Sequence, residues 1–285
     1  MTTLKTPLDH QITESIAMSR DTLIVIPARY ASQRYPGKPL AELRGSTGKA
    51  KSLIERSWEA AKRVPSGDRV VVASDSDEIL DAARAFGAEA IFTSSECRNG
   101  TERCAELLDE LDDEPEIVVN LQGDAPLIPD YFVESLIAAM RADPAVEVAT
   151  PVVRCTRALY DKLVADEKKN IVGGTFGAIS SAGNAHYFSK RIIPHFDAGK
   201  ADDDNLPVLL HIGLYAYRPA ALRKYVAGEP SQLEQLEGLE QLRFLDLGVP
   251  IRTIEVTSPE WEIWELNNPS DIPHIEASLK IMGLE

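Results

Sequence analysis

The strongest constraint on the fold is a regular alternation of short apolar runs with helical patterns over the first half of the chain. The apolar runs, each long enough for one buried strand, are Leu23–Ile26, Arg69–Ala73, Ala90–Thr93 and Glu116–Leu121. The segments with helical spacing lie between and after them, at Ser52–Arg63, Asp77–Phe86, Thr101–Leu111 and Asp130–Arg141. This alternation predicts an α/β fold with a doubly wound, mostly parallel sheet covered by helices on both faces. The carboxyl ends of the strands then share one edge, where ligands bind in such folds.

The second half of the chain is less regular. Strands are expected at Val146–Val153, Gly173–Ile179, Ala185–Phe188, Val208–Tyr217 and Ile251–Val256. Leucines three residues apart predict one helix with a buried stripe over Leu233–Leu247, and Ser270–Met282 predicts a closing helix. The turn at residues 181–184 joins two strands into a hairpin, which we expect to form a dimer arm.

The domain organisation expected from these patterns is one compact unit. The chain of 285 residues has no internal repeat, low-complexity tract or Gly/Ser-rich linker. Residues 1–20 are polar and lack the apolar core of a signal peptide, so we expect a flexible N-terminal extension. Residues 21–285 would form a single domain, in which residues 151–215 contain a smaller inserted subdomain.

Charge and cysteine content narrow the function classes. A net charge of −15 disfavours a protein that coats nucleic acid, which needs an overall basic face. No segment reaches the roughly 18 apolar residues of a membrane span, so no membrane role is expected. The three cysteines (Cys97, Cys104 and Cys155) form no C-x-x-C motif, which favours free thiols in a reducing cytoplasm. An acidic chain that binds an anion must gather cations locally or recruit a metal ion.

Such a local gathering of cations follows the first predicted strand. The loop after Ile26 carries Arg29, Arg34 and Lys38, no acidic residue, and several prolines that restrict its shape. Arginine forks and a lysine ammonium suit a polyphosphate. The loop has neither the Walker spacing nor a G-x-G-x-x-G fingerprint. The alternative is an ordinary solvated loop.

Two further strand ends carry polar residues. Gln122-Gly123-Asp124 follows the strand that ends at Leu121, and Asp124 offers a hard oxygen ligand for Mg²⁺; the alternative is a simple turn. Ser74 ends another strand and could contact a base or ribose, or cap the next helix.

Polar residues also occur at a helix start and along a later strand. Asn99 and Glu102 have the spacing of a capping box, and Arg103 could reach an anion at that helix N-terminus. His211 and Tyr215 alternate along one predicted strand and would face the same side.

Taken together, these motifs resemble the 3-deoxy-manno-octulosonate (Kdo) cytidylyltransferase family over about residues 21–285. The matching motifs are IPARYASQRYPGKPL (26–40), NGTER (99–103), NLQGDAP (120–126), YFSK (187–190), HIGLYAYR (211–218) and LEGLEQLR (236–243). The first and last of these are quite specific to the family. The resemblance implies a nucleotide-diphospho-sugar transferase-like fold in a homodimeric cytoplasmic enzyme, with residues 151–215 used for dimerisation and sugar binding.

The resemblance also implies a reaction and a set of site residues. CMP would pass from CTP to the anomeric hydroxyl of Kdo with Mg²⁺ as cofactor, releasing pyrophosphate and supplying lipopolysaccharide assembly. Catalytic roles fall to Arg29, Lys38 and Asp124. Nucleotide contacts fall to Pro27, Ala28, Arg34, Ala73, Ser74, Asn99 and Gly100. Sugar contacts fall to Arg103, Gln122, Lys190, His211, Tyr215, Glu240 and Gln241.

Three positions depart from the family pattern. Asn267 stands where a second metal-binding aspartate is expected, and Glu265, two residues earlier, could supply the missing carboxylate. Lys190 replaces an arginine, which loses a bidentate grip on a carboxylate, and Phe176 lies in a segment where the family has Val-Lys-Val.

These departures keep two alternatives open. One is the same chemistry on a different or amino-substituted sugar acid. The other is a non-catalytic, CTP-binding regulatory protein.

Overall fold

The computed structural model describes residues 22–31, 34–203 and 205–285, so the extension expected over residues 1–20 lies outside the described residues. The strands are β1 (Thr22–Ala28), β2 (Glu42–Arg44), β3 (Ala50–Ser52), β4 (Arg69–Ser74), β5 (Glu89–Phe92), β6 (Ile117–Leu121), β7 (Val148–Arg154), β8 (Thr175–Ile179), β9 (Ala185–Ser189), β10 (Leu209–His211), β11 (Leu214–Tyr217) and β12 (Ile251–Glu255). The α-helices are α1 (Leu53–Lys62), α2 (Asp77–Ala85), α3 (Gly100–Leu108), α4 (Asp130–Ala142), α5 (Arg157–Glu167), α6 (Pro219–Ala227), α7 (Gln232–Glu237), α8 (Leu242–Asp246) and α9 (Ile272–Ile281). Two short 3₁₀ helices are η1 (Lys38–Leu40) and η2 (Pro269–Asp271).

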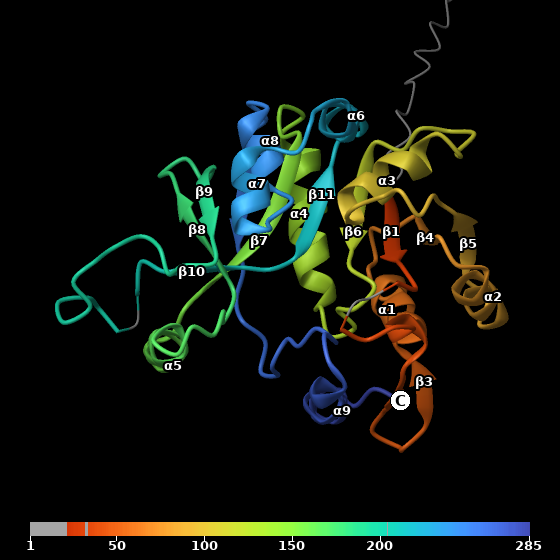
Figure 1. Ribbon diagram of the computed structural model, residues 1–285, viewed down its shortest axis with the longest axis horizontal. Coiled ribbons are helices and arrows are strands. Elements are labelled where there is room, and N and C mark those ends of the chain that lie inside the picture. The colour runs from red at the N-terminus through yellow and green to blue at the C-terminus, as the bar shows by residue number, and fades with distance from the viewer. Residues whose placement is uncertain (1–21, 32–33, 204) are drawn as a thin grey trace, which may run out of the picture.

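A ten-stranded mixed sheet forms the centre of the molecule (Figure 1). Its strand order is β5-β4-β1-β6-β11-β7-β10-β8-β9, with β12 paired to β7. Strands β5, β4, β1 and β6 are parallel, as expected from the alternating first half, whereas β11 joins β6 antiparallel and begins the mixed half. The predicted α/β fold class is confirmed.

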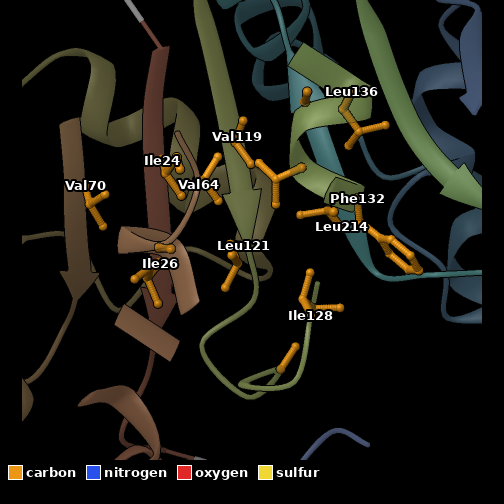
Figure 2. Close-up of a cluster of buried hydrophobic side chains, with 14 of the residues drawn as sticks. Ile24, Ile26, Val64, Val70, Val119, Leu121, Ile128, Phe132, Leu136 and Leu214 are labelled. Atoms are coloured by element: carbon orange, nitrogen blue, oxygen red, sulfur yellow. The ribbon is translucent and has the colours of Figure 1, made fainter. Parts of the chain in front are cut away.

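Two apolar cores, one on each face of the sheet, explain why β1 is buried along its whole length. Ile24 and Ile26 face the core that contains α1 and α4, and Figure 2 shows them with Val119, Phe132 and Leu136. The alternate residues of β1 face the second core, which contains α3, α6 and α8. A strand that is covered on both faces needs a continuous apolar run, which is the pattern that identified it.

The helix predicted over Leu233–Leu247 is wrong in one respect. It is two short helices, α7 and α8, separated at Gly238, which adopts a left-handed conformation with φ of 61°. Leu236 and Leu233, expected in a buried stripe, are 74% and 42% exposed. The break rotates the second helix, so the two halves no longer share one buried face.

The strand predicted over Val208–Tyr217 is also interrupted. Residues up to His211 form β10 and residues from Leu214 form β11, so His211 and Tyr215 do not lie on one continuous strand. Their rings are nevertheless neighbours, with centroids 5.4 Å apart.

Several smaller features complete the comparison with the sequence. The predicted hairpin is confirmed as β8 and β9, and the three cysteines are free thiols. The β2–β3 hairpin and helices α5 and α6 were not foreseen. Within residues 22–31, 34–203 and 205–285, no helix has the length and apolarity that crossing a membrane would require.

Candidate active site

The cationic loop follows β1 and is shaped as the sequence suggests. Gly37 has a φ of 69°, a left-handed conformation that favours glycine, and its N–H donates to the Tyr30 carbonyl at 3.1 Å. Lys38 follows as the first residue of η1. Arg29 is exposed and makes no hydrogen bond or ion pair with any described residue, so its guanidinium is available to a ligand.

The turn after β6 lies directly against the end of β1. A Cβ on Gly123 would lie only 2.6 Å from the Pro27 carbonyl oxygen, so glycine is required for this close approach. The next residue, Asp124, accepts a hydrogen bond from Lys38 Nζ at 2.6 Å. Two motifs that are 86 residues apart in sequence therefore meet at one carboxylate.

A segment from the end of the chain, residues 261–268, completes this corner; we call it the C-terminal strap. The Leu266 N–H donates to the Asp124 carbonyl oxygen at 3.0 Å, which fixes the strap beside the strand edge. Asn267 Oδ1 accepts a hydrogen bond from Arg34 Nη2 at 2.8 Å. The strap thus contacts both the cationic loop and the predicted metal ligand.

Glu265 lies on the strap close to Asp124. Part of its side chain is exposed, yet the protein atoms around its carboxyl group and the nearby Asp124 charge raise the pKa of Glu265 to about 7. The Asn267 amide acts in the opposite direction by hydrogen bonding to it. Two carboxylates that repel each other are a donor set suited to a hard divalent cation.

The opposite side of the site is the N-terminus of α3. The Asn99 side chain caps the helix by accepting from the Glu102 N–H at 2.8 Å. The predicted capping box is only half correct, because the Glu102 carboxylate accepts from the Arg98 N–H at 2.7 Å instead of from Asn99. Arg103 is 3% exposed and donates to Thr93 and, at 3.3 Å, to Asp75.

These elements enclose a cleft of about 590 Å³. The predicted site residues that line it are Pro27, Ala28, Arg29, Arg34, Lys38, Asn99, Gly100, Arg103, Gln122, Asp124 and Asn267. Five cationic side chains line the cleft against one carboxylate, that of Asp124. In a chain with a net charge of −15, this is the concentration of positive charge that an anionic ligand requires.

The remaining predicted residues do not line this cleft. Ala73 and Ser74 are fully buried on β4, where they pair in register with Pro27 and Ala28. Lys190 lies against the end of α7, where its Nζ would be 2.9 Å from a Cβ on Gly238.

A second group, the acceptor-side cluster, lies behind the N-terminus of α3 and comprises His211, Tyr215, Glu240 and Gln241. Glu240 Oε2 accepts from the N–H of Thr101, the residue after cleft-lining Gly100, at 3.2 Å. Gln241 is 2% exposed and Tyr215 is 3% exposed. Burial raises the pKa of both Glu240 and Tyr215, which favours their uncharged forms.

His211 is fixed as a neutral imidazole within this cluster. Burial lowers its pKa to about 3, and its Nε2 lies 2.9 Å from Thr150 Oγ1. Because the Thr150 hydroxyl donates to the Leu214 carbonyl at 2.8 Å, we assign the proton of His211 to Nε2. Nδ1 is then a hydrogen-bond acceptor.

Three residues important to this region carried no functional assignment from the sequence. Arg98 adds a fifth cation to the cleft, and its guanidinium pairs with Glu102 at 2.7 Å. Arg243 pairs with Glu102 at 3.0 Å and with Glu234 at 2.6 Å, although it is 1% exposed. Asn120 is completely buried on β6. The only sequence signal was that each lies in or beside a quoted motif.

Comparisons with known proteins place this geometry among nucleotide-transferring enzymes. A family model described as cytidylyltransferase matches residues 23–251. The 3-deoxy-manno-octulosonate cytidylyltransferase of Maricaulis maris is 41% identical over 261 residues, covering 92% of this chain and 98% of the relative. The mitochondrial 3-deoxy-manno-octulosonate cytidylyltransferase of Arabidopsis thaliana is 36% identical, covering 90% and 82%.

Solved structures give the same picture. A CMP:2-keto-3-deoxy-manno-octonic acid synthetase complexed with CTP aligns with a TM-score of 0.78 and 34% identity, covering 92% of this chain and 99% of that chain. A 4-diphosphocytidyl-2C-methyl-D-erythritol synthase from Anaerococcus prevotii, 15% identical with a TM-score of 0.54, shares the fold.

Proposed function

The chain belongs to the 3-deoxy-manno-octulosonate cytidylyltransferase family, and from that premise we propose that it transfers CMP from CTP to the anomeric hydroxyl of Kdo. The observation that carries the proposal is the cleft at the carboxyl ends of β1 and β6, which five cationic side chains line together with Asp124. Family membership disfavours the alternative of a non-catalytic CTP-binding protein.

The cationic loop after β1 forms one wall of the cleft, the cationic wall, against which the triphosphate would lie. Arg29 and Arg34 offer guanidinium forks and Lys38 offers a point charge to the phosphate oxygens. The anomeric hydroxyl attacks the α-phosphorus and loses its proton to solvent, so that a new P–O bond forms. The bond between the α-phosphorus and the α–β bridging oxygen breaks, and that oxygen leaves with pyrophosphate. The cationic wall holds the triphosphate in line for this displacement and stabilises the charge on the departing pyrophosphate.

Magnesium is the cofactor that we propose for this reaction. The chemistry of the donor set fits it, because Asp124 and Glu265 present two neighbouring carboxylates and the substrate phosphates supply further oxygens. Asn267 Oδ1 is engaged by Arg34, which favours Glu265 over Asn267 as the second protein ligand. When bound, the ion would neutralise phosphate charge and orient the α-phosphate.

The acceptor is proposed to lie toward the acceptor-side cluster. His211 Nδ1 and the Tyr215 hydroxyl can hydrogen-bond to sugar hydroxyls, and Arg103 can attract the carboxylate. Lys190 packs near Glu237, whose carboxylate accepts the Lys190 N–H at 3.0 Å. This position, which differs from the family's arginine, keeps a second candidate open: the same transfer to a different or amino-substituted sugar acid.

The test is pyrophosphate release from the purified protein with CTP, Kdo and Mg²⁺, with each component omitted in turn. We expect release only when all three are present. A panel of acidic eight- and nine-carbon sugars then separates the two candidates. Higher kcat/KM for another acid than for Kdo would establish the second, and release with no acid at all would contradict both.

We further propose that the protein is a homodimer, with the β8–β9 hairpin as the dimer arm. Ile171 and Val172, just before this hairpin, are 53% and 60% exposed and adjacent in sequence, so together they offer apolar surface to a partner. Sedimentation equilibrium of the wild type and of Val172→Asp tests this. We expect a dimer that the substitution weakens, and a monomeric wild type would contradict it.

A further inference from the structure

Asn120 is a buried polar residue whose hydrogen-bonding capacity is unused among the residues that the structure describes. Its side chain is 0% exposed, and neither Oδ1 nor Nδ2 has a hydrogen-bond partner among the described residues. Most buried amides are hydrogen-bonded, because a buried donor or acceptor without a partner destabilises the folded protein. Leucine has nearly the same shape and would avoid that cost.

The position of Asn120 relates it to the active site. On β6, Val118 belongs to the second apolar core, whereas Gln122 lines the cleft. Alternate residues of a strand share one face, so Asn120 lies on this face between the core and the cleft. Its cross-strand neighbour on β11 is Tyr215, a member of the acceptor-side cluster.

Only a thin layer separates Asn120 from the cleft. A Cβ on Gly100 would lie 3.0 Å from Asn120 Nδ2 and 3.2 Å from both terminal atoms of the Gln122 amide. A glycine at this point brings the backbone of α3 down onto the two amides. Gln122 makes no hydrogen bond through its side chain with the described residues, so it can turn away from Asn120 when a ligand binds.

The neighbouring acceptor-side cluster has the same unused capacity. Gln241 Nε2 is buried without a hydrogen-bond partner in the described part of the chain. An amide offers a donor and an acceptor together, which matches a hydroxyl group that can both accept and donate. A polyhydroxylated ligand fits this arrangement, whereas phosphate oxygens, which only accept, would leave Oδ1 unpaired.

We propose that Asn120 is a specificity-determining residue for the acceptor, and that its amide hydrogen-bonds to a hydroxyl of the bound sugar acid once Gln122 has turned aside. This inference rests on the proposed function. It adds that acceptor binding supplies a partner for an amide that has none among the described residues.

The test compares wild type with Asn120→Leu in two assays. Removal of an unsatisfied amide is expected to leave the melting temperature of the unliganded protein unchanged or higher. The KM for the sugar acid is expected to rise about 10- to 100-fold because its hydroxyl loses a partner, while the KM for CTP changes less than about twofold. Asn120→Ser, which keeps a smaller polar group, is expected to fall between the two and carries the test if the leucine variant does not fold.

Thr253→Val is the matched control, because it also replaces a buried polar group by an isosteric apolar one. Thr253 donates to the Gly183 carbonyl at 2.9 Å, away from the cleft. We expect it to lower the melting temperature and leave both KM values unchanged. If Asn120→Leu behaves like this control, or raises both KM values together, Asn120 is a structural residue and the proposal is overturned. An inactive wild type would instead overturn the proposed function.

Discussion

The cationic loop and the N-terminus of α3 face each other across the cleft, yet they are held by different means. On the loop, Arg29 is exposed and unpaired with described residues, and Arg34 makes one exposed hydrogen bond to Asn267. Behind α3, Arg243 is 1% exposed and joins Glu102 to Glu234; we call these three residues the buried ion network.

The buried ion network is connected to the cleft, because its member Glu102 pairs with the cleft-lining Arg98. Burial opposes ionisation of Glu102, but hydrogen bonds from Arg98 and Arg243 outweigh it and lower the pKa of this carboxyl. The Arg243 guanidinium also lies 4.0 Å from the centre of the Tyr225 ring, and Tyr225 accepts from the Asn99 amide at 2.9 Å. The cationic loop therefore presents its charges to a ligand, whereas the charges behind α3 are paired with one another and hold the backbone of that helix in place.

The largest effect is expected at Asp124, which the cationic loop contacts through Lys38. Asp124→Asn removes a proposed metal ligand and the partner of Lys38, so we expect kcat to fall by about 10³-fold or more. Steady-state pyrophosphate release measures this. Circular dichroism checks that the variant is folded, and a variant with more than a tenth of wild-type activity would contradict the role.

Arg243→Met tests the buried ion network. It leaves the Glu102 and Glu234 carboxylates buried without their common partner, so we expect unfolding to become easier by about 3–5 kcal/mol. Urea denaturation gives the value. Arg98→Met is the matched control, because Arg98 pairs with the same Glu102 carboxylate through a half-exposed side chain and its loss should cost less than about 1 kcal/mol. Equal losses of unfolding free energy in the two variants would contradict the expected difference between a buried and a half-exposed partner of Glu102.

Arg29→Met tests the loop in the opposite way. Since Arg29 makes no hydrogen bond or ion pair with a described residue, the free energy of unfolding is expected to stay within about 0.5 kcal/mol of wild type. The KM for CTP is expected to rise about tenfold through loss of a charge-assisted contact to phosphate. Arg69→Met, on an exposed ion pair with Glu89, is the control and should leave the KM unchanged. An Arg29→Met variant that is destabilised but fully active would contradict the assignment of Arg29 to ligand binding rather than to stability.

The smallest effects are expected on the C-terminal strap. Glu265→Gln should weaken Mg²⁺ binding by roughly tenfold, and Asn267→Asp should strengthen it only a few-fold, because Arg34 already engages that side chain. Calorimetric titration of Mg²⁺ in the presence of CTP measures both without turnover. If Glu265→Gln binds the ion as wild type does, Glu265 is not the second ligand.

The parts of the site that could be predicted from sequence are those coded by neighbouring residues. Arg29, Lys38 and Asp124 follow two strands whose apolar runs are unmistakable, and the parallel topology brings them to one edge. The helix break at Gly238 was not predictable from the leucine spacing, because a left-handed residue interrupts a periodicity that otherwise continues.

The buried residues behind α3 lay beyond the reach of sequence patterns for a different reason. Arg243 and Glu102 are 141 residues apart, so their pairing depends on how α3 packs beside α8. Asn120 lies within an apolar strand, where pattern analysis finds only one polar interruption. The contacts and surroundings of such groups depend on long-range packing, which local periodicity in the sequence does not encode.

The C-terminal strap makes the site depend on residues that are far apart in the sequence. The cationic loop and Asp124 lie in the first half of the printed sequence, whereas the Leu266 N–H that donates to the Asp124 carbonyl lies far downstream. Residues 284 and 285 also hydrogen-bond to the segment that contains β2, β3 and α1. The Ser46 N–H donates to the Leu284 carbonyl, and the Arg56 guanidinium donates to the Glu285 carbonyl. Figure 1 shows the C-terminus beside β3. The position of Asp124 therefore depends on a segment that lies far from it in the sequence.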